Sequence, residues 1–354
     1  MKIGITADLH LTTKERNPER RNALLDILNQ CKQQAVDQLI IAGDLFDASM
    51  PNHAEFEDIC KSKEYSNIQL FIIPGNHDAN INNKQIVAKN VHIFDQPTRE
   101  KLSDNWEACF IPYRDGQTMG KGIGEIQGRD SSRKWALVGH GDWFGSLDAP
   151  NSYEESKVYM PLTRKEIELL KPDLVFLGHI HVPYKKGNIF YTGSPCPMDV
   201  TETGYRRFLI LDTSKSVVDE LRVKSDFLYF TARLLVMPTD NEQKLVLSQI
   251  DQCKRNWLTN EEDLERIKIR VNMVGYSKDR SELIPAIEKG FSGFHFLEVP
   301  DISKVNEAND YDRNFIVEKF RDELDHADYD FNREGETDKD SILLKAMELI
   351  YGRG

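Results

Sequence analysis

The chain has 354 residues and a formal net charge of −12, and 40% of its residues are hydrophobic. This length exceeds the usual size of one hydrophobic core, so we expect two domains, or one domain with an appendage. The acidic balance argues against a surface that holds nucleic acid by charge alone, but it is uneven, because residues 301–340 contain 14 acidic and 6 basic side chains. Most of the acidity therefore belongs to one late segment.

Two further counts bear on location. No stretch approaches the roughly 18 uncharged residues of a membrane span, and the first residues lack the apolar core of a secretion signal. The five cysteines are scattered without a CxxC pair, a pattern typical of reduced compartments. We expect a soluble cytoplasmic protein.

The first three quarters of the chain alternate short apolar runs with amphipathic segments. The apolar runs are continuous, as expected of strands that are covered on both faces in an α/β sandwich. The predicted strands are residues 2–7, 38–44, 68–75, 136–140, 174–181, 189–193 and 207–212, and the first predicted helix is 22–38.

From about residue 226 the pattern predicts a smaller α+β unit, with strands at 227–237, 265–273 and 293–299 and helices at 241–255 and 279–290, the latter broken near Pro285. Two helices, 314–324 and 341–351, follow and are separated by a polar bridge. We therefore expect three parts: residues 1–225, a capping domain at 226–300, and an acidic linker with helices at 301–354.

Polar side chains follow nearly every apolar run of the first part. They are Asp8, His10, Asp44, Asn76, His77, Asp78, His140, His179 and His181. Ordinary alternatives exist, such as strand-end caps, a helix N-cap at Asp44 or an exposed edge pair at His179 and His181. Carboxyl ends of strands in open α/β sheets converge on one crevice, however, and independent turns are not expected to gather so many imidazoles and carboxylates there.

This set of side chains indicates a metal centre. Residues two apart in an extended segment point the same way, so Asp8 with His10, and His179 with His181, can each offer two ligands to one point. Imidazole and carboxylate ligands without thiolate suit Mn²⁺, Fe²⁺ or Zn²⁺ at catalytic sites. The number of ligands exceeds the need of one ion, which favours two ions with a bridging carboxylate, an arrangement suited to displacement at phosphorus.

In order along the chain, the segments "ADLH", "GDLFD", "GNHD", "VGHGDW" and "GHIH" resemble the motif series of the calcineurin-like metallophosphoesterase superfamily. Within it, "GDLFDASMP", "GHIHVP" and the stretch "IFYTGSPCPMDVTETGYRRFLILD" are similar to the SbcD-type nucleases of double-strand break repair. The resemblance implies a four-layer α/β/β/α sandwich with a smaller α+β capping domain and a C-terminal helical tail.

The resemblance also implies roles for the motif residues. It implies two ligand sets that share Asp44: Asp8, His10 and His181 complete the first, and Asn76, His140 and His179 complete the second. His77 would then face the substrate phosphate, where it stabilises charge or protonates the departing oxygen, and Asp78 would secure the turn. Asp47 occupies a position where archaeal and eukaryotic relatives carry histidine, and we hypothesise that it orients His77 by a hydrogen bond.

The implied chemistry is attack of an activated water on a DNA phosphodiester, by exonuclease or endonuclease cleavage, with two divalent ions, Mn²⁺ first among Mg²⁺, Fe²⁺ and Zn²⁺. Basic residues beside the motifs are candidates for contacts to the DNA backbone. Among them are Arg16, Arg20, Arg21, Lys185 and Arg206. The alternatives are a phosphodiesterase or phosphomonoesterase of the same fold that acts on small molecules, and a scaffold that no longer catalyses.

The resemblance further implies partners in DNA repair and recombination. The helices after residue 300 are expected to dock onto an SbcC-type ATPase, in a helix-in-groove mode; the alternative is that they pack back on the protein itself. A homodimer, giving a 2:2 complex, is expected through helices at residues 55–61 and 84–89.

Overall fold

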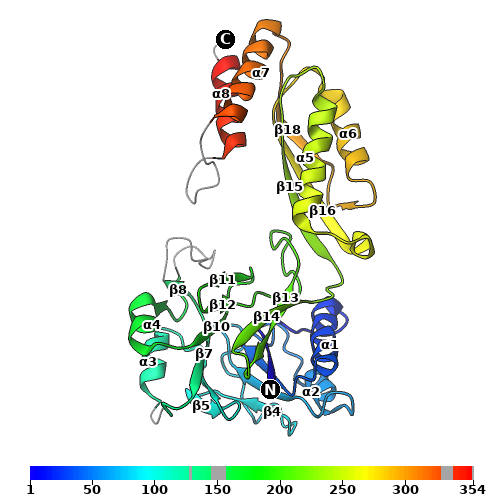
Figure 1. Cartoon of the computed structure of the whole chain (residues 1–354). Coiled ribbons are helices and arrows are strands. Elements are labelled where there is room, and N and C mark those ends of the chain that lie inside the picture. The colour runs from blue at the N-terminus through cyan, green and yellow to red at the C-terminus, as the bar shows by residue number, and fades with distance from the viewer. Residues whose placement is uncertain (127–129, 145–156, 328–337, 353–354) are drawn as a thin grey trace. The chain divides into compact units, whose positions relative to one another are not determined.

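A computed structural model describes residues 1–126, 130–144, 157–327 and 338–352 and shows two compact units, Met1–Leu228 and Tyr229–Gly354 (Figure 1). Each unit has its own hydrophobic core. Residues 301–354, predicted as a separate third part, fall within the second unit. The functional division at residues 225 and 300 stays a prediction.

The first unit contains two six-stranded sheets. One sheet has the order β14 (Val217–Arg222), β13 (Arg207–Asp212), β1 (Lys2–Thr6), β2 (Gln38–Ala42), β3 (Gln69–Ile73) and β4 (Val91–Ile93). The other has the order β11 (Tyr184–Lys186), β12 (Ile189–Tyr191), β10 (Leu174–Gly178), β7 (Lys134–His140), β6 (Trp106–Ile111) and β5 (Thr98–Lys101). Strands β1 to β4 are parallel, as are β6, β7, β10 and β12.

Four helices complete the layers. Helices α1 (Pro18–Gln33) and α2 (His53–Lys61) cover the outer face of the first sheet, and α3 (Met119–Gly124) and α4 (Arg164–Leu170) pack on the outer face of the second. A short ribbon of β8 (Trp143–Phe144) and β9 (Leu162–Thr163) joins the second group. The predicted four-layer α/β/β/α sandwich is confirmed.

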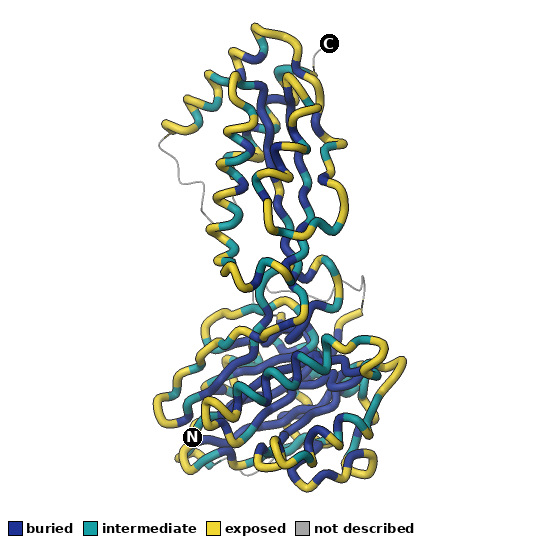
Figure 2. Tube along the Cα trace, turned by 90° about the vertical axis from the view of Figure 1, so that its right-hand side faces the viewer, coloured by how far each residue is buried: buried dark blue, intermediate teal, exposed yellow. Residues whose placement is uncertain are grey.

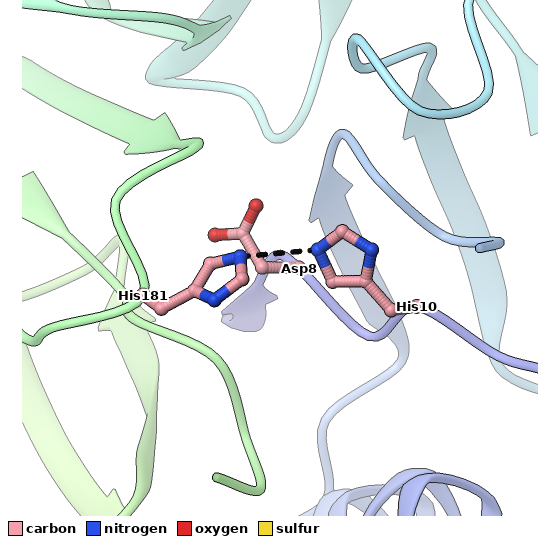
Figure 3. Close-up of side chains that lie close together, drawn as sticks. All are labelled: Asp8, His10 and His181. Carbon is pink, nitrogen blue, oxygen red and sulfur yellow. Dashed lines mark hydrogen bonds between the residues drawn. The ribbon is translucent and has the colours of Figure 1, made fainter. Parts of the chain in front are cut away.

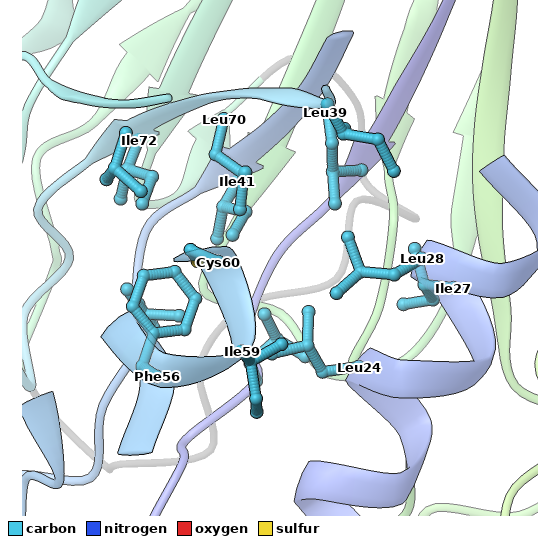
Figure 4. Close-up of a cluster of buried hydrophobic side chains, with 14 of the residues drawn as sticks. Leu24, Ile27, Leu28, Leu39, Ile41, Phe56, Ile59, Cys60, Leu70 and Ile72 are labelled. Atoms are coloured by element: carbon cyan, nitrogen blue, oxygen red, sulfur yellow. The ribbon is translucent and has the colours of Figure 1, made fainter. Parts of the chain in front are cut away.

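The continuous apolar runs follow from this layering. In β2, Leu39 and Ile41 face the helices, whereas Ile40 faces the opposite sheet. Figure 4 shows Leu24 of α1 and Phe56 of α2 in the cluster beneath the helices. Because successive side chains alternate between two buried faces, the central strands have no solvent face that needs polar residues. Figure 2 shows the resulting buried strands in dark blue.

The first helix is offset from its predicted range of 22–38. It begins at Pro18, whose missing N–H and fixed φ suit the first helical position. It ends at Gln33, because Ala35 adopts a left-handed backbone with φ of 52° and turns the chain toward β2.

The second unit has a sheet with helices on it. The sheet contains β15 (Leu228–Val236), β16 (Ile267–Ser277), β17 (His295–Phe296) and β18 (Asp301–Glu307), and the helices are α5 (Glu242–Trp257) and α6 (Leu283–Gly290), with 3-10 turns η1 (Glu261–Arg266) and η2 (Arg280–Glu282). Figure 1 shows α5 and α6 side by side. A break near Pro285 was predicted, but α6 continues through this residue. Pro285 lies in the first turn of the helix, where no intrahelical N–H bond is lost. Strand β18 was not predicted.

The two last helices, α7 (Tyr311–His326) and α8 (Lys339–Tyr351), pack back on the second unit. Val317 of α7 and Met347 of α8 are fully buried in a cluster that includes Tyr276 of β16. Most of the predicted polar bridge, residues 328–337, lies outside the described residues. Within the described part of the chain, no helix combines the length and apolar character that crossing a bilayer requires.

One of the two segments expected to mediate dimerisation is not helical. Residues 55–61 lie in α2, but 84–89 form a turn and an irregular segment. Backbone N–H groups of this segment bond side chains and not a helical carbonyl: Lys84 donates to Oδ1 of Asn82 and Val87 donates to Oε1 of Glu57, both at 3.0 Å.

Candidate metal centre

The candidate site lies where the carboxyl ends of strands from both sheets meet. Strands β1, β2 and β3 supply one side, and β7 and β10 supply the other. The backbone N–H of His179 donates to both carboxylate oxygens of Asp8, at 2.9 and 3.1 Å. Nδ1 of His140 bonds the carbonyl of Ala42 at 2.9 Å. These bonds hold the loops of the two sheets against each other.

Asp8, His10 and His181 form one group of ligand atoms (Figure 3). Nε2 of His10 and Nε2 of His181 face each other at 3.1 Å. The carboxylate of Asp8 lies beside them, and one atom of each residue lies within 4.8 Å of the others.

A second group forms around Asn76. Its Oδ1 lies 2.9 Å from Nε2 of His140 and 3.0 Å from Nδ1 of His179. The two imidazoles come from the second sheet and the amide from the loop after β3, so this group also spans both sheets.

Asp44 lies between the two groups. Its Oδ2 is 3.6 Å from Nε2 of His10 and 3.4 Å from Nε2 of His140. Its Oδ1 accepts the backbone N–H of His77 at 2.8 Å. The structure thus brings together all seven residues predicted as ligands, with Asp44 in the central position.

The backbone at the site is not extended, although the sequence predicted extended segments for Asp8 with His10 and for His179 with His181. Asp8, His10, Asp44 and His179 have φ angles of 54°, 45°, 50° and 94°. All four lie just past a strand end, in the left-handed region that side chains rarely adopt. Residues two apart still converge, but through left-handed turns, and such strained conformations typically persist at functional sites.

Two glycines make the close approach possible. A Cβ on Gly43, which has φ of 93°, would lie 2.1 Å from Nδ1 of His140, and a Cβ on Gly75 would lie 2.1 Å from Oδ1 of Asp44. The glycines of "GD" and "GNHD" are therefore needed because the backbone of each loop touches a candidate ligand.

Burial and charge determine the protonation of the site. Burial raises the pKa of Asp8 to about 6 and lowers the pKa of His10 and His179 to about 3. Burial is the largest single influence on His140 and Asp44 and opposes charge on both. The interaction between the two groups, together with Asp8 near His140 and His10 near Asp44, outweighs burial, so the pKa of His140 rises to about 9 and the pKa of Asp44 is lowered.

The hydrogen-bond pattern fits a site built for cations. The amide oxygen of Asn76 is only an acceptor, so the ring nitrogens of His140 and His179 that face it must both carry protons. Likewise, the opposed nitrogens of His10 and His181 need a shared proton. A divalent ion in each group would take the place of these protons, and nitrogen and oxygen donors without thiolate suit Mn²⁺, Fe²⁺ or Zn²⁺.

The acids beside the ligands have different tasks. Asp78 secures the turn, as predicted: its carboxylate accepts the N–H of Gly75 at 2.7 Å and of Phe46 at 3.1 Å. Asp47 instead bonds Ser49 and Nη1 of Arg20, the latter at 3.1 Å. The described residues show no hydrogen bond between Asp47 and His77, because Arg20 and Ser49 already hold this carboxylate.

The basic candidates fall into two groups. Arg20 also donates to the carbonyl of His10 at 2.7 Å, and Arg21 pairs with Glu55, so both have intramolecular tasks. Arg16 and Lys185 are exposed. Arg206, also a candidate for contact with the DNA backbone, is fully buried and is therefore not a surface residue.

Glu202 is a further residue of the site that was not predicted from the sequence. This buried carboxylate accepts from Nδ1 of His181 at 2.7 Å and from the Ser194 hydroxyl at 2.9 Å, and it lies 3.5 Å from Nη1 of Arg206. Arg206 also donates to the carbonyl of His181 at 3.0 Å. Glu202 is a single glutamate in a turn-rich loop and belongs to no recognisable sequence motif. Its contact with His181 is seen only in the structure.

Replacing Arg206 with methionine should lower the free energy of unfolding by about 3 to 5 kcal/mol, because it leaves Glu202 buried without its ion-pair partner. Urea unfolding of the metal-free protein measures the change. Arg164→Met is the matched control, since its pair with Glu168 has the same i,i+4 spacing but is exposed. A similar small effect in both variants would contradict the prediction.

Comparisons with known proteins agree with this geometry. A family model described as calcineurin-like phosphoesterase matches residues 1–183, and the chain belongs to this family. Members of the family use a dinuclear metal centre, and the two groups on either side of Asp44 supply candidate ligands for one.

Curated relatives carry a more specific name. The chain is 26% identical over 250 residues to the SbcD component of the nuclease SbcCD from Staphylococcus epidermidis, and the match covers 58% of this chain and 65% of that protein. It is 25% identical over 262 residues to the SbcD component from Escherichia coli, over 60% and 65% of the two chains. The match thus spans just under two thirds of the length of these relatives. A solved archaeal phosphodiesterase is 17% identical, with a TM-score of 0.34 over 63% of this chain and 100% of the other.

Proposed function

We propose that this protein is a two-metal DNA nuclease that hydrolyses phosphodiester bonds in DNA repair and recombination. The observation that carries the proposal is the placement of Asp44 between the His10 and His181 pair and the Asn76 group. Asp8, His10 and His181 would hold one ion, and Asn76, His140 and His179 would hold the other, with the Asp44 carboxylate within reach of both. Two ions held in this way supply an activated water and neutralise charge on the phosphate.

His77 acts on the substrate in this proposal. Its backbone N–H fixes Asp44, its side chain is exposed, and its ring meets the ring of His10 edge to face with centroids 4.7 Å apart. This position leaves an imidazole nitrogen available to donate a proton to the departing oxygen of the phosphodiester. Because an alkoxide is a poor leaving group, this proton is worth a large factor in rate.

DNA is proposed as the substrate because the curated relatives are named as nucleases. The exposed Arg16 and Lys185 are proposed contacts to the DNA backbone. Mn²⁺ is the proposed metal, since the ligands mix imidazole with carboxylate and amide oxygen. A cytoplasmic setting is supported by five cysteines that form no disulfide.

End-labelled duplex DNA tests the proposal. With Mn²⁺, the protein should shorten or cut the DNA, EDTA should stop the reaction, and labels at either end should distinguish exonuclease from endonuclease products. Hydrolysis of cyclic nucleotides without any cleavage of DNA would assign the site to a small-molecule phosphodiesterase instead.

An SbcC-type ATPase is the proposed partner, in a 2:2 complex with a dimer of this chain. The support is the name of the relatives and the apolar surface that α7 and α8 leave exposed. On α7, Phe315 and Ile316 are 54% and 51% exposed, and on α8 Leu349 is 58% exposed. Ile316 and Phe320, the latter 37% exposed, are four residues apart on one face of α7, a spacing that suits a helix-in-groove contact.

Phe315→Glu with Ile316→Glu should weaken capture of the ATPase by at least tenfold, because the substitutions place charge in an apolar contact while the buried Val317 keeps α7 in place. Binding is measured by pull-down or interferometry, with Mn²⁺-dependent hydrolysis as a check on the fold. The matched control is Val299→Glu, at an apolar position that is 72% exposed outside these helices. Equal binding by both variants would exclude this surface.

A further inference from the structure

We propose that Glu202 is a positioning residue of the metal centre, which fixes the tautomer and the ring orientation of His181. The inference rests on the proposed function, because it assumes that His181 binds an ion. It concerns a residue that lies behind the ligands and does not itself face the ion.

The two nitrogens of His181 face opposite environments. Nδ1 lies 2.7 Å from Oε1 of Glu202, while Nε2 lies 3.1 Å from Nε2 of His10. An ionised carboxylate can only accept hydrogen bonds, so Glu202 keeps a proton on Nδ1 of His181. The lone pair of Nε2 is then free to bind a metal ion. Carboxylates behind metal-binding imidazoles set the tautomer and raise the basicity of the ligand in this way.

Glu202 is itself held in a fixed orientation. Its Oε2 accepts from the Ser194 hydroxyl at 2.9 Å and from the N–H of Met198 at 3.1 Å, and the residue is 7% exposed. Arg206 lies 3.5 Å from the same oxygen and also donates to the carbonyl of His181. The buried pair of Glu202 and Arg206 therefore holds both the ring and the backbone of His181.

The other imidazoles of the site lack such support. His140 bonds a backbone carbonyl, that of Ala42. Nε2 of His179 has no hydrogen bond in the described part of the chain and lies 3.8 Å from the carboxylate of Asp142. Among the described candidate ligands, only His181 has a hydrogen bond to a carboxylate that is not itself a candidate ligand. Loss of Glu202 should therefore weaken the binding of one ion and spare the other.

Titration calorimetry with Mn²⁺ on the full chain tests this asymmetry. We expect two sites in the wild type, and in Glu202→Ala a 10- to 100-fold loss of affinity at one site with the other within threefold. Glu202→Gln keeps an oxygen that can accept from Nδ1–H and should restore the affinity to within about fivefold. Glu107→Ala is the matched control and should leave both affinities within threefold, because Glu107 is also a buried glutamate paired with an arginine, Arg99, but has no hydrogen bond to a candidate ligand in the described part of the chain.

A second readout does not depend on affinity. In the metal-free wild type at alkaline pH, where no ion competes for Nε2, long-range ¹H–¹⁵N spectra should show the proton of His181 on Nδ1. This measurement decides the matter even if Glu202→Ala fails to fold.

Four results are distinguishable. Unchanged affinities in Glu202→Ala, an equal loss at both sites, or a proton on Nε2 would each overturn the role of Glu202. A wild type that binds no Mn²⁺ would instead overturn the proposed function.

Discussion

Replacing Asp44 with asparagine is expected to reduce Mn²⁺-dependent hydrolysis by about 10³-fold or more, which corresponds to ~4 kcal/mol of lost transition-state stabilisation. The reason is its central position: Oδ2 lies within 3.6 Å of ring nitrogens from both ligand groups, His10 and His140. An amide offers one neutral oxygen where the site has an anionic carboxylate. The rate constant at saturating Mn²⁺ on a model phosphodiester measures the loss.

The control for this variant is Asp58→Asn, in a helix that is not part of the site. It should hydrolyse the same substrate at the rate of the wild type. If Asp44→Asn kept a tenth or more of the activity, a bridging role for this carboxylate would be excluded.

Replacing His77 with alanine is expected to lower kcat by roughly 10²- to 10⁴-fold while Mn²⁺ binding persists. The side chain is exposed and is not held by any hydrogen bond in the described structure, whereas its backbone N–H, which alanine retains, holds Asp44. The variant therefore removes the proton donor but keeps the backbone hydrogen bond to Asp44.

A leaving group of low pKa separates the two possible roles of His77. The p-nitrophenolate released from a p-nitrophenyl phosphodiester needs little protonation. His77→Ala should therefore lose much less kcat on this substrate than on DNA. An equal loss on both substrates, or a loss of bound Mn²⁺, would show that His77 is not the proton donor.

Much of the fold follows from local pattern. The buried strands β1, β2, β3, β7, β10 and β13 were predicted close to their observed positions because both of their faces are covered, which makes them continuous apolar runs. Strand β18 was missed because its residues are mostly polar and charged, and its place depends on pairing with β16. The segment 84–89 was expected to be helical, but its backbone N–H groups at Lys84 and Val87 bond side chains instead.

The candidate site was also predictable only in part. The seven ligand candidates were found because they follow strands, and the convergence of strand ends is a general property of such sheets. The reason why Asp8 and His10 converge was wrong, since left-handed turns and not extended backbone bring them together. The partners of Asp47 and the role of Glu202 depend on contacts between distant segments, which spacing along the chain does not reveal.

The central claim is that two cations share Asp44. Anomalous diffraction from a crystal soaked in Mn²⁺ tests it most directly. We expect two peaks, one beside Asp8, His10 and His181 and the other beside Asn76, His140 and His179, with the Asp44 carboxylate in contact with both. A single peak away from Asp44, or no peak at all, would contradict the account.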